Sequence, residues 1–213
     1  MSTDAPLTLM QWFSPSFPVG AFAYSHGLEY AIDTGQITSA EALSEWLVDV
    51  VVQGSGSNDV ILLAAAYNAD AGLIPEIDAT ARAFAASQER LTETLDQGQA
   101  FSRTVEAVWA TEIGPLSYPV AVGVAAQAKS MPLDLTAEYF LHAFVANLVS
   151  VAVRLVPLGQ TEGQATLAKL APLIRDTARA AISQDIDDIA SNCFALDIAS
   201  MQHETQYSKV FRT

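Results

Sequence analysis

The three histidines are the side chains of this sequence best suited to bind a transition metal. They are His26, His142 and His203, and no His-x-x-His, Cys-x-x-Cys or His-Glu-x-x-His spacing joins them to one another or to Cys193. We expect His142 to be buried and hydrogen-bonded, and a surface His26 or His203 to bind a metal only transiently. The sequence therefore predicts no metal site and no resident cofactor.

Nucleophiles and phosphate-binding residues are present, but the patterns that activate them are missing. Cys193 has no histidine near it in the sequence, and no Gly-x-Ser-x-Gly occurs. The Gly-Ser-Gly turn at 54–56 is followed by Ser-Asn and no lysine, so it is not a phosphate-binding loop. Asp187 and Asp188 belong to an acidic run that is typical of a solvated surface. These patterns favour a protein that is not an enzyme.

Three polar residues interrupt the most apolar stretch of the chain, 135–156. Asn147, Ser150 and Arg154 are spaced i, i+3 and i+7, so in a helix they share one face. A buried arginine needs partners. We therefore expect Arg154 to be structural and bound to a carboxylate or to a helix C-terminus. A catalytic arginine would instead need exposure beside a nucleotide.

The last seventeen residues, 197–213, contain no glycine or proline and many hydrogen-bonding side chains. A chain end usually frays unless contacts hold it. In a helix His203, Tyr207 and Phe211 would share a face, whereas in an extended chain alternate residues would face opposite sides. Two interpretations remain open: an irregular tail packed on its own bundle, or a segment docked on another protein.

Helix signals position these residues along the chain. Capping boxes at Thr38–Glu41 and Thr161–Gln164 each open a helix, and Pro172 is expected to kink or split the second of these. Helices are expected over 25–34, from Thr38 to the break at 54–56, from Ser57 or Asn58 onward, from Pro75 onward, and over 88–110, 119–130, 135–156, 161–184 and 185–192.

The first 24 residues form an apolar segment of a different kind. Pro15 and Pro18 block a regular helix, and Gly20 permits an unusual backbone angle. We expect an ordered loop that packs on the core or on a partner. It carries four large apolar side chains: Trp12, Phe13, Phe17 and Phe22.

The composition favours one helical domain. The chain has 213 residues, of which 51% are hydrophobic, with alanine and leucine prominent. That is enough for a single core, and no sustained alternation of apolar and polar residues predicts a strand. We therefore predict an all-α fold: one domain over 1–213, built as a bundle of roughly eight to ten helices.

The charge and cysteine content narrow the class of partner and the compartment. The formal net charge is −14, from 10 basic and 24 acidic residues. Such a surface repels nucleic acid and anionic membranes and attracts a basic protein, although it also serves solubility. One cysteine allows no internal disulfide, and no signal peptide is read, so a cytoplasmic location is expected. No membrane span is predicted, because polar residues interrupt the longest apolar run, 139–158.

Three long motifs resemble the UreF family of urease accessory proteins. Residues 14–29, Ser-Pro-Ser-Phe-Pro-Val-Gly-Ala-Phe-Ala-Tyr-Ser-His-Gly-Leu-Glu, are similar to the family's N-terminal motif. Residues 146–164, Ala-Asn-Leu-Val-Ser-Val-Ala-Val-Arg-Leu-Val-Pro-Leu-Gly-Gln-Thr-Glu-Gly-Gln, are similar to its central helix and turn. Residues 197–212, Asp-Ile-Ala-Ser-Met-Gln-His-Glu-Thr-Gln-Tyr-Ser-Lys-Val-Phe-Arg, are similar to its C-terminal ending. The motifs keep the family's order and span nearly the whole chain.

The sequence departs from the family's pattern at four positions. Ala21 and Ala23 stand where the family often has glycine and serine, and Gln202 and Lys209 stand where arginine is common. The tail is therefore less basic than usual, and contacts that need a bidentate arginine at these points are in doubt.

The resemblance implies an all-α protein that does no chemistry on urea. It implies binding to UreD (also called UreH), recruitment of the nickel-carrying GTPase UreG, and docking on the urease apoprotein for nickel insertion and lysine carbamylation. It also implies a homodimer within a two-plus-two complex with UreD, and a tail that orders on UreD. Residues of the matching motifs are then expected to bind partners: Tyr24, His26, Glu29, Met201, His203, Glu204, Gln206, Tyr207, Phe211 and Arg212. Asn147 and Arg154 are expected to be structural.

Two alternative functions remain open at this point. One is a regulator of GTP hydrolysis by UreG that supplies Arg154, Arg103 or Arg212. The other is a metallochaperone that uses His26 or His203. We expect His203 to be a hydrogen-bonding group at an interface rather than a nickel ligand.

Overall fold

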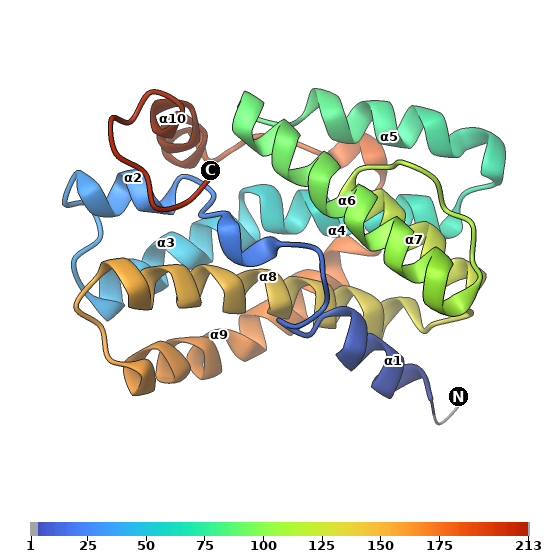
Figure 1. Ribbon diagram of the computed structural model, residues 1–213, viewed down its shortest axis with the longest axis horizontal. Helices are drawn as coiled ribbons and strands as arrows, with labels where there is room; N and C mark the ends of the chain where they lie inside the picture. The colour runs from blue at the N-terminus through green and yellow to red at the C-terminus, as the bar shows by residue number, and fades with distance from the viewer. Residues whose placement is uncertain (1–3, 213) are drawn as a thin grey trace.

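The computed structural model describes residues 4–212 and shows ten α-helices and three short 3-10 turns, with no β-strand in that range. The α-helices are α1 (Ala5–Trp12), α2 (Leu28–Asp33), α3 (Ala40–Val52), α4 (Ser55–Asn68), α5 (Ile74–Ala83), α6 (Gln88–Trp109), α7 (Tyr118–Ala128), α8 (Leu133–Leu155), α9 (Gln160–Ala181) and α10 (Phe194–His203). The 3-10 turns are η1 (Ala21–Ala23), η2 (Ala71–Leu73) and η3 (Ile186–Asp188). The predicted all-α fold is confirmed (Figure 1).

The core lies where α4, α7 and α8 meet. Helix α4 packs along α7, α8 packs along α9, and α6 covers the other side of α7. Leu63, Leu141 and Leu148 are fully buried there, and each such leucine contributes about 1.5–3 kcal/mol relative to an exposed one. Gly123 allows the close approach of α7 to α4, since a Cβ on it would overlap the carbonyl oxygen of Leu63.

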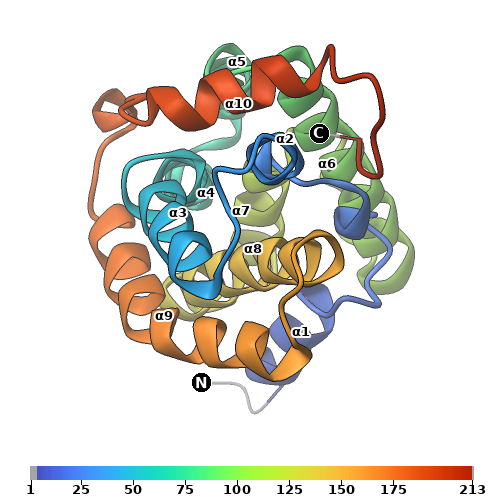
Figure 2. The same ribbon diagram turned by 90° about the vertical axis from the view of Figure 1, so that its left-hand side faces the viewer.

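Helix α10 lies across the outside of this bundle, above α2 and the start of α6 (Figure 2). It is joined to α9 by the segment that contains η3, where a short helix over 185–192 was predicted. After α10 the chain turns back along α2, and its last described residues lie beside η1 near the other end of the sequence (Figure 1). The end of the tail thus meets a segment from early in the sequence.

Helices α6, α7 and α8 begin and end within two residues of the predicted bounds, and α5 begins one residue before the predicted Pro75, but two predicted caps are wrong. Ser39, rather than Thr38, caps α3, and its hydroxyl accepts a hydrogen bond from the backbone N–H three residues on, at 3.2 Å. Helix α4 starts directly after Gly54, earlier than a cap at Ser57 or Asn58 would allow.

Two other helix starts also differ from the prediction. His26 and Gly27 adopt left-handed backbone angles, with φ of 59° and 75°, so α2 starts only after them. Helix α9 is preceded by Gly159, whose N–H donates to the carboxylate of Glu162 at 2.8 Å. The predicted cap at Thr161 therefore lies inside the helix.

Helix α9 is continuous through Pro172, which was expected to kink or split it. The proline removes the donor that would bind the carbonyl of Ala168. Both residues are exposed, so water can solvate that carbonyl. The helix therefore continues through Pro172 and loses one backbone hydrogen bond on its solvent-exposed side.

The N-terminal segment packs on the core, which was one of the two possibilities predicted for it. It begins with α1, which was not predicted. Trp12 at the end of α1 is fully buried and meets the rings of Phe101 and Trp109 edge-on, with centroids 5.3 and 5.8 Å away. Phe17 is buried as well, whereas Phe22 in η1 is 65% exposed.

Two stretches are long and apolar enough to cross a membrane by length and composition, Ala40–Asn68 and Leu133–Leu155. Their most apolar windows are 56% and 50% buried inside the bundle, and the first stretch is broken between α3 and α4 at Gly54. Core helices of soluble proteins pass the same test, so these stretches are weak evidence for a membrane span.

Candidate partner-docking site

Glu29 in α2 holds the end of the chain in place. Its buried carboxylate accepts hydrogen bonds from the backbone N–H groups of Val210 at 2.6 Å and Phe211 at 2.8 Å. It also lies 3.2 Å from Nε2 of His203. A buried carboxylate is costly unless donors surround it, and here the donors come from the tail. The backbone N–H groups of the tail therefore fix its path along α2.

His203 is fully buried between two carboxylates. Its Nδ1 lies 2.6 Å from Glu89 in α6, and its Nε2 faces Glu29. The ammonium group of Lys209 lies 2.6 Å from Glu89 as well. Two carboxylates, the imidazole and the ammonium group form one cluster, which we call the tail clasp: Glu29, Glu89, His203 and Lys209.

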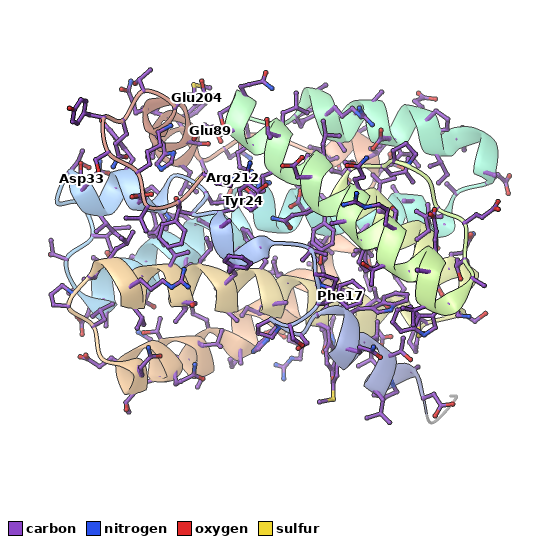
Figure 3. The ribbon with its side chains drawn as sticks, in the orientation of Figure 1. Phe17, Tyr24, Asp33, Glu89, Glu204 and Arg212 are labelled. Carbon is purple, nitrogen blue, oxygen red and sulfur yellow. The ribbon has the colours of Figure 1, made fainter. Side chains whose placement is uncertain are left out.

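The end of α10 is fixed on the first turn of α6. The carboxylate of Glu204 accepts hydrogen bonds from the N–H groups of Gln88 and Glu89, at 2.6 and 3.4 Å. These donors have no partner within their own helix, and a negative charge is favoured there. The hydroxyls of Ser200 and Ser87 are 2.7 Å apart. Figure 3 shows Glu204 and Glu89 side by side at this junction.

Close contact between α10 and α2 requires a glycine. Gly27 has a φ of 75°, and a Cβ on it would lie 2.6 Å from the backbone nitrogen of Ser200. Any other residue would therefore push α10 away from α2. Because this contact packs α10 directly against α2, the short helix α2 is able to support the tail.

The last described residues bind η1 and the segment after it. The backbone N–H of Arg212 donates to the carbonyl of Ala23 at 2.7 Å, and its guanidinium lies over the ring of Tyr24, 5.8 Å from the centroid (Figure 3). The hydroxyl of Tyr24 donates to Asp96 at 3.1 Å. Burial and this hydrogen bond raise the pKa of Tyr24 to about 12, which keeps it a neutral donor.

Asn147 and Arg154 act from α8 on the same loop. Asn147 donates to the carbonyls of Ala21 and Tyr24, at 2.9 and 3.2 Å. Arg154 is exposed, so the expectation of a buried arginine on a carboxylate or helix end is wrong. Its guanidinium lies over the ring of Phe211, 5.6 Å from the centroid, where it covers the tail from outside.

The histidines occupy the opposite environments to those predicted. His142 is exposed, whereas His26 and His203 are buried. Burial and the neighbouring Arg90 lower the pKa of His26, whose Nδ1 lies 3.1 Å from the guanidinium. Within residues 4–212, no group of three or more His, Cys, Asp or Glu side chains is placed to hold a metal ion. Neither buried histidine is available for the transient surface metal binding considered above.

The residues predicted to bind partners fall into two sets. Five are buried in the chain itself: Tyr24, His26, Glu29, His203 and Phe211. Five are exposed or half-buried: Met201, Glu204, Gln206, Tyr207 and Arg212. Residues 197–212 therefore pack on their own bundle, which was one of the two interpretations of the tail, but residues 197–203 are helical rather than irregular. Docking of the exposed set on a partner remains a prediction.

An apolar stripe on α10 was missed by the sequence reasoning. Phe194, Ile198 and Met201 are 73%, 54% and 49% exposed, and their spacing of four and three residues places them on one face of the helix. Tyr207 and Val210 extend the exposed apolar surface into the tail. The signal was available in the sequence as two opposite apolar stripes over 194–203. We call Phe194, Ile198, Met201, Tyr207 and Val210 the docking face.

Comparison with known proteins shows which sequences the chain is similar to. The family model described as UreF matches residues 37–171. The chain is 64% identical to a urease accessory protein UreF of Roseobacter denitrificans over 213 residues, which cover 100% of this chain and 96% of the relative. It is 52% identical to that of a Ruegeria species over 214 residues, covering 100% of both chains, and 49% identical to that of Ruegeria pomeroyi over 209 residues, covering 97% and 96%.

The family model ends before α10, and the tail clasp joins residues on both sides of the matched range. The relatives from Roseobacter denitrificans and the Ruegeria species, however, align over the whole of this chain, including the clasp and the docking face. On the family model and on these relatives together, the chain belongs to the UreF family of urease accessory proteins.

Proposed function

We propose that this protein is a non-catalytic scaffold of urease maturation that works in the cytoplasm. In this proposal it binds UreD/UreH, recruits the GTPase UreG, and brings both to the urease apoprotein for nickel insertion. The observation that carries the proposal is the docking face, an exposed apolar surface on an element that is fixed to the bundle by buried contacts.

The docking face has the properties of a binding surface. Scattered exposed apolar residues are common on protein surfaces, but an aligned set on one rigid helix marks an interaction site. Phe194, Ile198 and Met201 form such a set, and aromatic and methionine side chains are enriched at interface cores. Because the tail clasp already holds α10, little conformational entropy is lost when a partner covers it.

The two sets of predicted site residues receive different roles in this proposal. The buried Glu29, His203 and Phe211 position the tail without touching a partner. The exposed Met201 and Tyr207 contact it directly, and Glu204, Gln206 and Arg212 border the contact. With a net charge of −14, the protein favours a partner whose complementary surface is basic.

The test is a change of the docking face that leaves the clasp intact. The double variant Ile198→Ser, Met201→Ser should lose co-purification with co-expressed UreD while its helical circular dichroism and thermal midpoint stay unchanged. Leu73→Ser is the matched control, because Leu73 in η2 is 52% exposed and lies outside the tail. Co-purification of the double variant at the level of the control would contradict the proposal.

Removal of residues 197–213 would be a less clean test. It would take the buried His203 and Phe211 out of the fold and leave the Glu29 carboxylate without its donors. Loss of binding would then report unfolding as well as loss of contact. The mass of the complex with UreD, measured on the unaltered protein, tests the proposed homodimer separately: a mass that corresponds to two copies of each chain supports it, and a one-to-one mass contradicts it.

A regulatory action on UreG is the second candidate, and Arg103 is the residue that favours it. Arg154 and Arg212 are engaged on Phe211 and Tyr24. Arg103 in α6 is exposed and makes no hydrogen bond or ion pair within residues 4–212, so it is able to reach a nucleotide without breaking the fold. Single-turnover GTP hydrolysis by UreG should slow with Arg103→Ala if this function exists, and an unchanged rate rejects it.

A further inference from the structure

A cavity of about 330 Å³ opens between the N-terminal segment, α6, α7 and α8. It lies on a different part of the molecule from the exposed stripe of α10. Cavities of this size between helices of a bundle are typical small-molecule sites. Aromatic side chains make up a large part of its wall. Seven such residues line it: Trp12, Phe13, Phe17, Phe22, Tyr118, Phe140 and Phe144.

The inner end of the cavity is polar and carries two carboxylates. Glu93 is fully engaged: Arg90 lies 2.5 Å from one of its oxygens, and Gln97 donates to the other at 2.9 Å. Asp59 in α4 is different. Its nearest cation is also Arg90, at 3.9 Å, which is beyond hydrogen-bond distance. The Asp59 carboxylate therefore borders the cavity with capacity to accept further hydrogen bonds.

The charge of this inner end is negative at neutral pH. Glu93 and Asp59 supply two negative charges and Arg90 one positive charge. The pKa of Asp59 is raised to about 6, and burial is the largest cause of this rise. The ionised carboxylate therefore lacks enough positive charge beside it to compensate its burial. Burial and Arg90 lower the pKa of His26, which therefore adds no cation. A bound positive charge would relieve the imbalance.

The chemistry of the walls selects the kind of cation. Aromatic rings attract organic ammonium groups and their apolar stems, but offer no ligands to a metal ion. The side chains of residues 4–212 include no cluster suited to a metal. On its other side Asp59 borders a smaller cavity of about 70 Å³, with room for a few waters only. The larger cavity is therefore the one that can admit an organic ligand.

We propose that this cavity binds a small organic ammonium ion, with its charged nitrogen at Asp59 and its apolar part among the aromatic rings. A positively charged nitrogen within hydrogen-bond distance of Asp59 would make a charge-assisted hydrogen bond with it. An anion would meet two carboxylates there, and a neutral ligand of the same shape would leave Asp59 uncompensated. Selectivity for the ammonium over a neutral isostere is thus the signature of the site.

Calorimetric titration of the full chain at neutral pH tests the proposal with benzylammonium as the probe and benzyl alcohol as its neutral counterpart. We expect saturable one-to-one binding of benzylammonium, and binding of the alcohol weaker by about tenfold or more. Asp59→Asn should weaken benzylammonium by about tenfold and leave the alcohol unchanged. Asp49→Asn, an exposed position in α3 outside the cavity, is the matched control and should change neither.

A second variant guards against an indirect effect of the charge change. Ala146→Phe, at a cavity-lining residue of α8, should abolish binding of both probes by filling the space, with the fold monitored by circular dichroism. Equal affinity for the amine and the alcohol, or full binding by Asp59→Asn, overturns the proposal. Unchanged binding by a folded Ala146→Phe variant overturns the location in this cavity.

Discussion

The backbone N–H of Phe211 donates a 2.8 Å hydrogen bond to the carboxylate of Glu29, which joins α2 to a residue 182 positions later in the chain. Phe211 is buried, and Arg154 covers its ring. The tail is therefore part of the fold, and the exposed docking face depends on contacts that a partner would never touch. Binding and stability can be separated experimentally because different side chains carry them.

Glu29→Gln should loosen the tail without removing it. The amide keeps one acceptor, but its NH2 group faces N–H donors, and the carboxylate beside His203 is lost. The expected cost is about 1–3 kcal/mol in urea unfolding, with faster proteolysis after α10. Glu76→Gln, on the exposed side of α5, is the control and should change neither measurement. Equal stability of the two variants would show that the clasp does not hold the tail.

Gly27→Ala should separate α10 from α2. The change is compared with Gly35→Ala, which has nearly the same φ, 76° against 75°, but open space where its Cβ would lie. Both variants lose about 1–2 kcal/mol to left-handed strain. Only Gly27→Ala also meets the backbone of Ser200, so its thermal midpoint should fall further. The difference between the two variants measures the packing of α10, and no difference would contradict the close contact.

Stability should fall in acid as Glu93 is protonated. Burial opposes its ionisation, but the charge of Arg90 and the hydrogen bond with His26 outweigh burial and lower the pKa of Glu93 to about 2. The group contributes stability above its unfolded pKa of 4.5, and that contribution is lost as the pH falls toward 2. The total is about 3 kcal/mol. Glu93→Gln should flatten this part of a stability-against-pH curve measured by urea unfolding.

Asp59 should act in the opposite direction at higher pH. Its pKa is raised from 3.8 to about 6, so the folded state prefers the protonated acid. Stability from this group is present at low pH and is lost as the pH rises from about 4 to 6, by about 2–3 kcal/mol. Asp59→Asn should therefore be more stable than the unaltered protein at pH 7 and no more stable at low pH. A variant that is destabilised at pH 7 would contradict this assignment.

Glu204→Gln should weaken the attachment of α10 to the start of α6. The amide can still accept from Gln88, but the negative charge at the helix N-terminus is lost. Because the group is exposed, the cost is a few tenths of a kcal/mol and should shrink at high salt. Glu45→Gln, in the middle of α3, is the control. Equal salt dependence of the two variants would argue against an end-of-helix role.

Local sequence patterns predicted those helices whose limits are set by local chemistry. Proline, glycine and the spacing of apolar residues predicted the ends of α6, α7 and α8 closely, because each of these signals acts on residues within a few positions of it in the sequence. Helix α1 was not predicted, because Pro15 and Pro18 indicate only the loop that follows it. The kink predicted at Pro172 does not occur. The energetic cost of a proline inside a helix depends on whether water reaches the one carbonyl that loses its donor, and the sequence alone does not show this.

The environment of the charged side chains could not be predicted in this way. His203 is buried because Glu29 and Glu89 meet it from 174 and 114 residues away, and no local pattern announces that meeting. Arg154 is exposed because its partner is the ring of Phe211 rather than a carboxylate. The family resemblance located the motifs that form the site, but it did not distinguish residues that face inward from those that face a partner.

The joining of Glu29 to Phe211 also has a consequence for biosynthesis. On the ribosome α2 emerges early, yet its carboxylate has to wait for almost the entire chain before its donors exist. This contact between α2 and the tail therefore forms only after residues 210 and 211 have been made, and a shorter product leaves the Glu29 carboxylate without these two donors.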